Sequence, residues 1–258
     1  MDSHKAQIIA VANQKGGVGK TTTALSLGAA FASLDLNVLV IDLDPHGSAT
    51  IHLAFYPEDV TQSALALFEP SSAPEDLSDL IQRGRDHPFD FIPGNPRLAE
   101  LDSQLGSLQG KGILLSQSLK ALVTEYDAII LDCPPQQGVI LVNALVAAGL
   151  TLIPTQTEFL AMHGLRLIFD TIRMLNKALP QPIAYRVLAT MFDRRVSACQ
   201  RVYNVLRKKM GAHLLKTVIH IDTKFREASA RGSVITQVAP GSRGSREYLQ
   251  LARELQKL

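Results

Sequence analysis

The chain has 258 residues, 46% of them hydrophobic, and its 26 Lys and Arg against 24 Asp and Glu leave a net charge of +2. This length and apolar content support a complete hydrophobic core, and with the low net charge they exclude a chain that stays disordered. The only two cysteines, Cys133 and Cys199, lie far apart in sequence, which excludes a disulfide scaffold and favours a reducing, cytoplasmic compartment. The first residues reach Gly and Lys before any apolar run develops, so we expect no signal peptide.

Short apolar runs alternate with longer segments of helical pattern along the chain. The predicted strands span residues 7–12, 37–43, 89–92, 127–131, 150–154, 183–190 and 215–219. The predicted helices span residues 20–34, 138–148, 158–178, 197–210 and 243 onward. Strands that alternate with helices in this way pair in parallel through crossover helices. The sequence therefore predicts an α/β fold with a doubly wound, mostly parallel sheet, helices on both faces and a single domain over residues 1–258.

Two segments need a separate interpretation. Residues 56–110 are rich in Pro, Ser and Asp, and we expect loops, short helices and one strand there. Residues 138–154 are almost all apolar, but a membrane-spanning helix needs about 20 such residues. Because Gly149 interrupts this run and Pro154 closes it, we interpret it as a helix followed by a buried parallel strand.

A glycine-rich motif follows the first predicted strand and opens the first predicted helix. It reads Lys15, Gly16, Gly17, Val18, Gly19, Lys20, Thr21, Thr22. Its glycines let backbone N–H groups point at phosphate oxygens, and the helix N-terminus adds partial positive charge. Lys20 is placed to reach the β- and γ-phosphates, and the Thr21 hydroxyl to ligate Mg²⁺. Against the pattern G-x-x-x-x-G-K-[ST], Gln14 stands at the first glycine, and an additional lysine, Lys15, lies inside the loop.

Three aspartates end predicted strands near this loop. Asp132 closes the strand at 127–131 and is placed to hold Mg²⁺ directly or through water, while Asp42 and Asp44 close the strand at 37–43. In open α/β sheets, ligands bind at the carboxyl ends of the strands. We therefore predict Thr21, Asp132 and Asp42 as metal ligands. A carboxylate at this edge is also placed to orient the water that attacks the γ-phosphate.

Charge is distributed unevenly along the chain. Residues 183–258 hold 15 Lys and Arg against 5 Asp and Glu, a net charge of +10, whereas residues 1–182 are net acidic. A basic face at one end of a fold attracts polyanions. The alternative is that these side chains only keep the protein soluble.

With these motifs, the chain resembles the ParA/MinD family of deviant Walker A ATPases, which have a P-loop NTPase fold. The resemblance rests on KGGVGKTT at 15–22, DLDPHGS at 42–48, DCPP at 132–135, TMFDRR at 190–195 and the EA…G…SRG…Y pattern that ends at Tyr248. It implies ATP and Mg²⁺ as ligands and a sandwich homodimer in which Lys15 reaches the partner's nucleotide. It also implies that Asp44 positions the hydrolytic water and that the adenine lies near the end of the 183–190 strand and the loop around Asp222.

A narrower resemblance is to the ParA-like proteins of bacterial chemotaxis operons, often called ParC. It rests on DPHGS, VNALVAA, IPTQTEFLAMHGL and IDTKFREAS. It implies that the cargo is a cytoplasmic chemosensory array and that the partner is an adaptor of that array. A general partition ATPase would instead have a ParB-like, centromere-binding partner. His46 stands where many partition ATPases have Gln; we interpret it as a subfamily marker, because the sequence shows no partner for a catalytic histidine.

The resemblance also assigns the basic last third a role. ParA-like dimers bind double-stranded DNA without sequence preference, and the positions that correspond here are Arg195, Lys224, Arg226 and Arg231. Contacts from Lys and Arg to phosphates are independent of sequence and sensitive to salt. We therefore expect the protein to associate with the nucleoid in its ATP state.

The C-terminal segment decides between DNA and membrane as the surface that is bound. MinD-type relatives bind membrane through a C-terminal amphipathic helix. Here Tyr248, Leu251, Leu255 and Leu258 fall on one helical face, a stripe more typical of core packing, and no Phe or Trp accompanies them. We therefore expect this helix to dock on the sheet and not on a membrane.

The predicted function is a slow, partner-stimulated ATPase that converts ATP and water to ADP and phosphate and so positions a cellular cargo. Three alternatives remain open. The first is a chromosome or plasmid partition ATPase, and the second is a MinD-like regulator on the membrane surface. The third is a metabolic enzyme of the same fold that transfers phosphate or uses ATP in ligation, as dethiobiotin synthetase does; the basic last third weighs against it.

Overall fold

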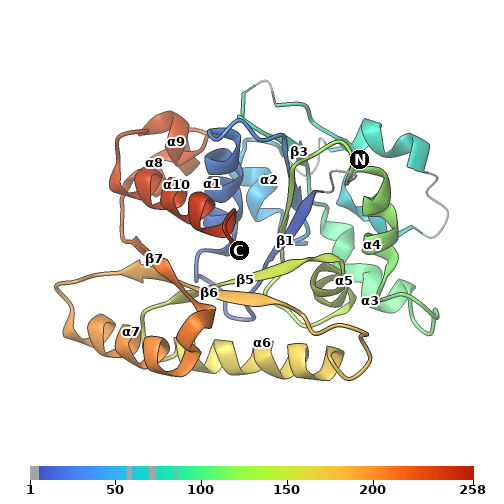
Figure 1. Cartoon of the computed structure of the whole chain (residues 1–258). Coiled ribbons are helices and arrows are strands. Elements are labelled where there is room, and N and C mark those ends of the chain that lie inside the picture. Colours follow the sequence, from blue (N-terminus) through green and yellow to red (C-terminus); the bar gives the residue numbers. More distant parts are fainter. Residues whose placement is uncertain (1–5, 57–59, 70–73, 85) are drawn as a thin grey trace.

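The computed structural model describes residues 6–56, 60–69, 74–84 and 86–258. Seven strands form one sheet in the order β3-β2-β4-β1-β5-β6-β7 (Figure 1). The strands are β1 (Gln7–Val11), β2 (Val38–Asp42), β3 (Asp90–Ile92), β4 (Ala128–Asp132), β5 (Leu150–Gln156), β6 (Tyr185–Phe192) and β7 (Leu214–His220). Each pair of neighbouring strands is parallel, which confirms the predicted fold class.

The strands at the centre of the sheet are apolar along nearly their whole length, because both of their faces are covered. All five residues of β2 and of β4 are buried. Near-continuous apolar runs are typical of parallel sheets that helices cover on both sides. The register of β4 sets Asp132 opposite Val11 of β1 and opposite Asp42 of β2. Two of the predicted site carboxylates therefore end neighbouring strands at the same edge of the sheet.

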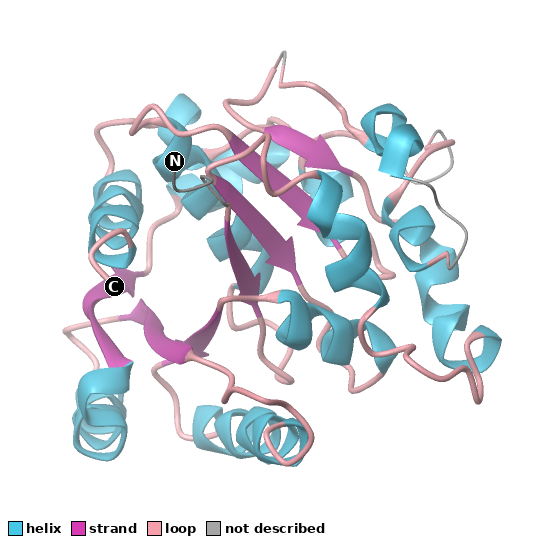
Figure 2. Ribbon diagram, turned by 45° about the vertical axis from the view of Figure 1, so that its right-hand side comes forward, coloured by secondary structure: helices cyan, strands magenta, loops and turns pink. Residues whose placement is uncertain are grey.

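Helices cover both faces of the sheet (Figure 2). One face carries α1 (Lys20–Ala32), α2 (Ser48–His52), α8 (Lys224–Ala230), α9 (Ile235–Val238) and α10 (Arg243–Leu255). The other carries α3 (Leu101–Gln104), α4 (Leu114–Ser118), α5 (Val139–Ala147), α6 (Ala161–Leu175) and α7 (Ser197–Met210). A separate apolar core lies on each face, so the sheet separates the two layers of side chains.

The C-terminal helix α10 packs against α1 and β7, as predicted. Tyr248, Leu251 and Leu255 are buried, whereas Leu258 lies beyond the end of the helix and is 60% exposed. The Tyr248 hydroxyl lies 2.9 Å from the Thr23 hydroxyl of α1, inside the core. The apolar stripe is thus used for packing up to Leu255, and the prediction that included Leu258 in it is wrong because the helix ends first.

Two glutamates of α10 also cover the edge of the sheet. The Lys216 and Thr217 N–H groups of β7 donate to the Glu254 carboxylate at 2.7 and 2.9 Å. Nearer the start of the helix, Glu247 accepts the His220 N–H at 2.8 Å. Unpaired edge groups are a template for unwanted strand pairing, and here side chains of the docked helix satisfy them.

The apolar run at 138–154 forms α5 and the buried strand β5, as interpreted from the sequence. No helix within the described part of the chain is both long and apolar enough to cross a membrane. The irregular region contains β3 and short 3-10 helices at 64–68, 74–80 and 96–100. The sequence did not predict α2, α4, α8 and α9, because elements of four to seven residues are too short to display a helical period.

Candidate functional site

The predicted phosphate loop connects β1 to α1 at the centre of the sheet. Gly17 and Gly19 have φ angles of +74° and +89°, a left-handed conformation that favours glycine. Helix α1 begins at Lys20 with no side-chain cap and no acidic residue in its first turn. Its first N–H groups are therefore left for an anion, and the helix dipole favours one there.

Side chains at the first residues of the loop and on β6 fix it in place. The Asn13 amide donates to the Pro154 carbonyl of β5 at 2.8 Å and accepts the Lys15 N–H at 3.0 Å. The Thr190 hydroxyl of β6 donates to the Val18 carbonyl at 2.9 Å. The loop is held against these two strands before any ligand binds, which lowers the ordering cost of binding.

The additional lysine of the loop is paired within its own chain. The Lys15 ammonium contacts the carboxylate of Glu158, in the turn between β5 and α6. The α6 backbone lies against this lysine, since a Cβ added at Gly164 would come 2.8 Å from the Lys15 Cβ. Beside the ion pair, Phe159 is 86% exposed and Leu160 is 65% exposed. The ion pair therefore adjoins an exposed apolar surface.

Lys20 and Asp132 form the buried end of the site. Lys20 is buried and donates to the Lys15 carbonyl at 3.3 Å; burial lowers its pKa, against the opposing charges of Asp132 and Asp44. Asp132 is fully buried, and among the described residues neither of its carboxylate oxygens has a hydrogen-bond partner of ordinary geometry. Burial and then the charge of Asp42 raise the Asp132 pKa well above its ordinary value.

A buried carboxylate without a well-formed hydrogen bond is costly unless a cation or a proton compensates it. Asp132 ends the strand beside β1, and both the Thr21 hydroxyl and the Lys20 ammonium are near enough to oppose the rise of its pKa. Carboxylate and hydroxyl oxygens are the ligands that Mg²⁺ prefers. The donor set of Thr21 and Asp132 therefore fits a magnesium ion at the mouth of the phosphate loop.

Asp42 is engaged by its own surroundings. Its Oδ2 accepts hydrogen bonds from the Thr50 N–H at 2.9 Å and the Thr50 hydroxyl at 2.7 Å, and its Oδ1 accepts the Asp44 N–H at 3.0 Å. Burial raises the Asp42 pKa to about 6, in spite of these hydrogen bonds. The carboxylate fixes the segment between β2 and α2. Its role as a metal ligand stays a prediction.

Asp44 has a partner that the sequence did not reveal. Its Oδ1 accepts the His46 N–H at 3.0 Å and also lies 3.0 Å from the His46 ring Nδ1. The sequence interpretation found no partner for His46; the structure corrects it, because the turn after β2 folds the ring back onto the carboxylate two residues earlier.

A pocket of about 340 Å³ begins at the phosphate loop. Its wall is formed by Gly19, Thr22, Gln156, Thr190, Met191, Ile219, His220, Ile221, Asp222, Phe225, Arg226 and Tyr248. His220 is buried, its Nδ1 lies 2.7 Å from the Glu247 carboxylate, and its Nε2 has no partner among the residues described. Met191 has a φ of +52°, a conformation that is rare outside glycine and collects at ligand sites. The end of the 183–190 strand and the loop around Asp222, where the family resemblance placed the adenine, both line this pocket. The resemblance did not single out His220 or Met191, because the wall is assembled from segments far apart in the chain.

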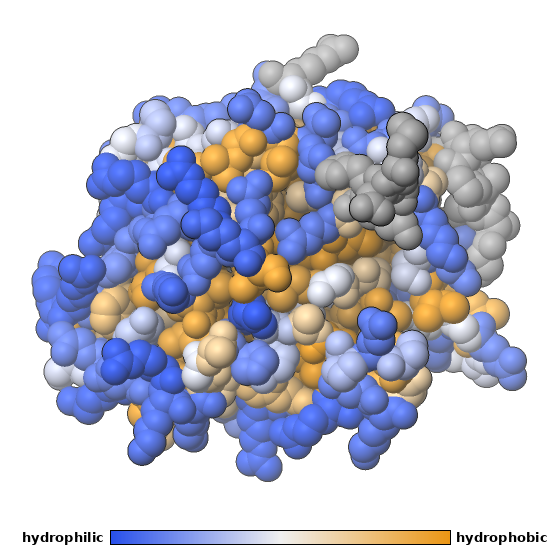
Figure 3. Space-filling view, in the orientation of Figure 1, coloured by the Kyte–Doolittle hydropathy of each residue, from blue (hydrophilic) through white to orange (hydrophobic). Residues whose placement is uncertain are grey.

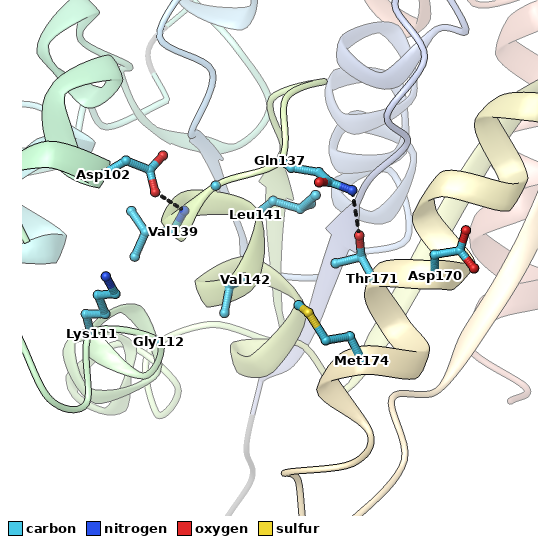
Figure 4. Close-up of a pocket in the computed structure, with 11 residues that line it drawn as sticks. Asp102, Lys111, Gly112, Gln137, Val139, Leu141, Val142, Asp170, Thr171 and Met174 are labelled. Carbon is cyan, nitrogen blue, oxygen red and sulfur yellow. Dashed lines mark hydrogen bonds between the residues drawn. The ribbon is translucent and has the colours of Figure 1, made fainter. Parts of the chain in front are cut away.

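A second pocket, of about 420 Å³, lies between α5 and α6 and contains no residue of the phosphate loop (Figure 4). Gln137 on its wall donates to the Gln14 side chain at 3.1 Å and to the Thr171 hydroxyl at 3.3 Å. Gln14 itself donates to Thr171 at 2.7 Å. These hydrogen bonds give a structural role to Gln14, which occupies the position of the first glycine in the phosphate-loop pattern: its side chain connects the start of the loop to α6.

Comparison with known proteins agrees with this geometry. A family model described as an AAA domain matches residues 6–185. The chain is 36% identical over 250 residues to the sporulation initiation inhibitor protein Soj of Bacillus subtilis, covering 96% of this chain and 98% of that protein. It is 32% identical over 252 residues to the chromosome partitioning protein ParA of Myxococcus xanthus, covering 97% and 88%. The chain belongs to the ParA/MinD family of P-loop ATPases.

Solved structures show the same architecture. The cobyrinic acid a,c-diamide synthase of Mycobacterium smegmatis with bound ATP analogue and magnesium superposes with a TM-score of 0.83 at 29% identity, covering 98% of this chain and 95% of that chain. The complex of a Cyanothece McdA variant with ATP reaches a TM-score of 0.85 at 21% identity, with 98% and 97% coverage, a likeness that shows the fold alone.

The basic residues predicted to bind DNA lie in different local settings of this ParA/MinD-family chain. Arg195 donates to both carboxylate oxygens of Asp193, at 3.0 and 2.8 Å, and Lys224 pairs with Glu227 at 2.7 Å. Arg226 lines the 340 Å³ pocket, whereas Arg231 lines a different one beside α2. Their role as DNA contacts stays a prediction.

A second group of basic side chains lies on α7. Arg201, Arg207, Lys208 and Lys209 are exposed on a helix that has no acidic residue. None of the four forms an ion pair with a residue that the structure describes. Figure 3 shows hydrophilic side chains that project at the lower left, where α7 lies in Figure 1, with apolar side chains between them. We call these four residues the α7 basic face; the run RKK in an acid-free helix was the signal that could have identified it from sequence.

Proposed function

We propose that this chain is an ATP-dependent positioning ATPase. It binds ATP and Mg²⁺, closes as a homodimer, holds double-stranded DNA non-specifically and hydrolyses ATP when a partner on the cargo stimulates it. The observation that carries the ATPase part is the buried carboxylate of Asp132, without a well-formed hydrogen bond, near Lys20, the first residue of a helix whose N-terminus has no side-chain cap. A relative named for chromosome partitioning and a similar structure that holds an ATP analogue and magnesium support the proposal.

We propose a role for each residue around the phosphate loop. Backbone N–H groups of residues 16–22 hold the phosphates, and Lys20 neutralises the charge on the β- and γ-phosphates. Thr21 and Asp132 hold the magnesium ion, which neutralises the same charge when it is bound. Asp44 orients the attacking water, and the 340 Å³ pocket receives the nucleoside.

The dimer is proposed from Lys15 and its surroundings. A lysine supplied in trans would neutralise charge on the partner's nucleotide, as an arginine finger does. Large apolar side chains as exposed as Phe159 and Leu160 are typical of surfaces that meet another protein. Because Lys15 is paired with Glu158 in the single chain, this ion pair must open or re-form across the interface as the dimer closes.

DNA binding is proposed from the net charge of +10 in residues 183–258 and from the α7 basic face. The contacts carried over from the family, Arg195, Lys224, Arg226 and Arg231, belong to the same proposal. In a cell, the ATP state would be cytoplasmic and associated with the nucleoid. The buried stripe of α10 does not favour the MinD-like alternative on a membrane.

The cargo is proposed from the narrower resemblance. The segments DPHGS and IPTQTEFLAMHGL favour a chemosensory array, with an adaptor of that array as the stimulating partner. A ParB-like partner and a chromosome or plasmid cargo are the second choice, supported by relatives named Soj and ParA. Stimulation of phosphate release by one purified partner and not by the other decides between them.

A metabolic role is a second candidate, because the similar synthase from Mycobacterium smegmatis shares 29% identity. A ligase or a kinase consumes ATP only with its acceptor present. We expect this chain to release ADP and free phosphate without any acceptor. Absence of that release, with full ATP binding, would favour the metabolic role.

The experiment that tests the proposed function is double-stranded DNA binding with ATP, with ADP and without nucleotide, each at two salt concentrations. We expect binding only with ATP, weaker at the higher salt, and lost in Lys20→Ala. Binding that ignores the nucleotide would contradict the switch. Absence of binding in every condition would reduce the basic last third to ordinary surface charge.

A further inference from the structure

The turn that follows β2 holds the proposed water-orienting carboxylate through two bonds to one oxygen. Oδ1 of Asp44 accepts the His46 N–H and lies 3.0 Å from the His46 ring Nδ1. The Gly47 N–H donates to the Asp44 carbonyl at 2.8 Å and closes the turn. Pro45 occupies the second position of this turn. Its ring fixes the φ angle there, and the fixed turn directs the His46 side chain back toward Asp44.

The two partners differ in burial. The Asp44 side chain is 10% exposed, whereas the His46 side chain is 68% exposed. Asp44 lies close enough to Lys20 for its charge to raise the lysine's pKa, so its carboxylate is at the phosphate end of the site. His46 thus contacts the buried carboxylate from the surface. Because the His46 side chain is exposed, we expect its replacement to leave the core intact.

The hydrogen-bond roles follow from the chemistry of the groups. An ionised carboxylate only accepts hydrogen bonds, so the ring nitrogen beside it, Nδ1, carries the proton. Oδ1 then has two donors from His46, and no hydrogen bond to Oδ2 occurs within the described residues. A carboxylate that orients water needs one oxygen free and its torsion fixed, and this arrangement supplies both.

We propose that His46 is a positioning residue for ATP hydrolysis: its Nδ1–H fixes Oδ1 of Asp44 and leaves Oδ2 to the attacking water. In that step the water oxygen bonds to the γ-phosphorus while the bond from phosphorus to the β–γ bridging oxygen breaks. ADP keeps that electron pair, and the water proton leaves toward Oδ2. This inference rests on the proposed function, because it assigns His46 a task only if Asp44 serves hydrolysis.

The test compares two substitutions of similar shape, His46→Leu and His46→Asn. The Asn amide nitrogen occupies the place of Nδ1 and restores a donor, whereas Leu has none. Phosphate release from Mg²⁺-ATP is measured for the full chain without a stimulating partner, together with KM and the ATP-dependent dimer. We expect His46→Leu to lower kcat about fivefold to tenfold, with KM within about twofold and an unchanged dimer, and His46→Asn to recover most of the loss.

A double substitution tests whether His46 acts through Asp44. In an Asp44→Ala background, His46→Leu should have no further effect on the residual rate, because two residues that act as one unit are not additive. His213→Leu, which removes another exposed histidine, controls for the loss of an imidazole on the surface.

The possible failures are distinguishable. If Asp44→Ala abolishes hydrolysis while His46→Leu keeps the normal rate, the inference is overturned and the proposed function stands. If Asp44→Ala itself hydrolyses ATP normally, the proposed role of that carboxylate fails first. An Asn variant as slow as the Leu variant, or a further loss in the double variant, also overturns the positioning role.

Discussion

The end of the sheet that carries the phosphate loop, here called the phosphate end, and the basic last third of the chain, residues 183–258, use charge in opposite ways. At the phosphate end, Lys20, Asp42, Asp44 and Asp132 are buried and interact with one another. In the last third, Arg195 is exposed and Lys224 is half-buried, and each pairs with a neighbouring acidic side chain. The α7 basic face is exposed without such pairs among the residues described.

This difference shows that the number of charged residues in a region does not indicate how strongly they interact unless their burial is also known. Two charges in a buried site interact strongly because little water screens them, whereas exposed pairs contribute about 0 to 1 kcal/mol. We therefore expect single substitutions to abolish the function of the phosphate end. In the last third, we expect a measurable loss of function only when several basic residues are replaced together.

Lys20→Ala should have the largest effect. Removing the buried ammonium leaves the carboxylates of Asp44 and Asp132 uncompensated and removes the cation that meets the phosphates. We expect ATP affinity to fall at least about a hundredfold, measured by calorimetric titration with Mg²⁺. Lys177→Ala, at an exposed position, is the control and should bind ATP normally. A loss of less than about tenfold would remove the contrast between the two regions.

The α7 basic face should show a graded effect. Replacing Arg207, Lys208 and Lys209 by Ala should lower DNA affinity about tenfold and reduce the salt slope of binding by up to about 2.7, since each phosphate contact contributes about 0.9. The control removes the same number of charges from α6 and the residues after it: Arg166, Arg173 and Lys177 are replaced by Ala, and the first two of these pair with Asp170. Equal losses of DNA affinity in both triple variants would mean that only net charge matters.

Arg195→Ala alone should change DNA affinity less than about threefold, because Asp193 already pairs with its guanidinium.

Asp132→Asn should separate stability from function at one buried position. Neutralising a buried carboxylate that lacks a well-formed hydrogen bond removes a desolvation cost, so the ligand-free protein should be as stable or more stable by about 1 kcal/mol. Its stabilisation by Mg²⁺-ATP should fall by at least about 1.4 kcal/mol, a tenfold loss of affinity. Denaturant unfolding with and without ligand measures both. A ligand-free variant that is clearly less stable would show that Asp132 is a structural residue.

The smallest effect concerns the pH dependence of stability. Burial raises the Asp42 pKa to about 6, so between about pH 4 and 6 the folded protein holds a proton that the unfolded chain has released. The unfolded state then binds fewer protons, and the Asp42 contribution to stability falls as pH rises through that window. Half-buried His52 and His87, whose pKa values partial burial lowers, act in the opposite direction.

A comparison of the Asp42→Asn variant with the unchanged protein measures the contribution of Asp42 to the pH dependence of stability. From about pH 4.5 to 6.5, stability of the Asp42→Asn variant should fall less, or rise more, than that of the unchanged protein. Urea unfolding at a series of pH values measures it, with the exposed Asp35→Asn as the control. Parallel pH curves for Asp42→Asn and the unchanged protein would contradict a raised pKa.

The regular elements could be predicted from sequence because each carries its own signal. Apolar runs such as QIIAV and AIILD are local, and the loop from Lys15 to Thr22 combines glycines and lysines in a fixed spacing. The fold class and the phosphate loop follow from them. The short helices α2, α4, α8 and α9 were missed because tertiary contacts, and not a period of their own, stabilise them.

The sequence by itself determined the sheet, the loop and the aspartates at the strand ends, because these depend on residues that are neighbours along the chain. Only the tertiary structure decided that Glu158 pairs with Lys15, that Gln14 meets Thr171 and that His220 lines the 340 Å³ pocket. The first two contacts join residues 143 and 157 positions apart, and no local pattern encodes which distant side chains the crossovers of a parallel sheet bring together. Even the short-range contact of His46 with Asp44 depended on the shape of a turn that the sequence pattern left undetermined.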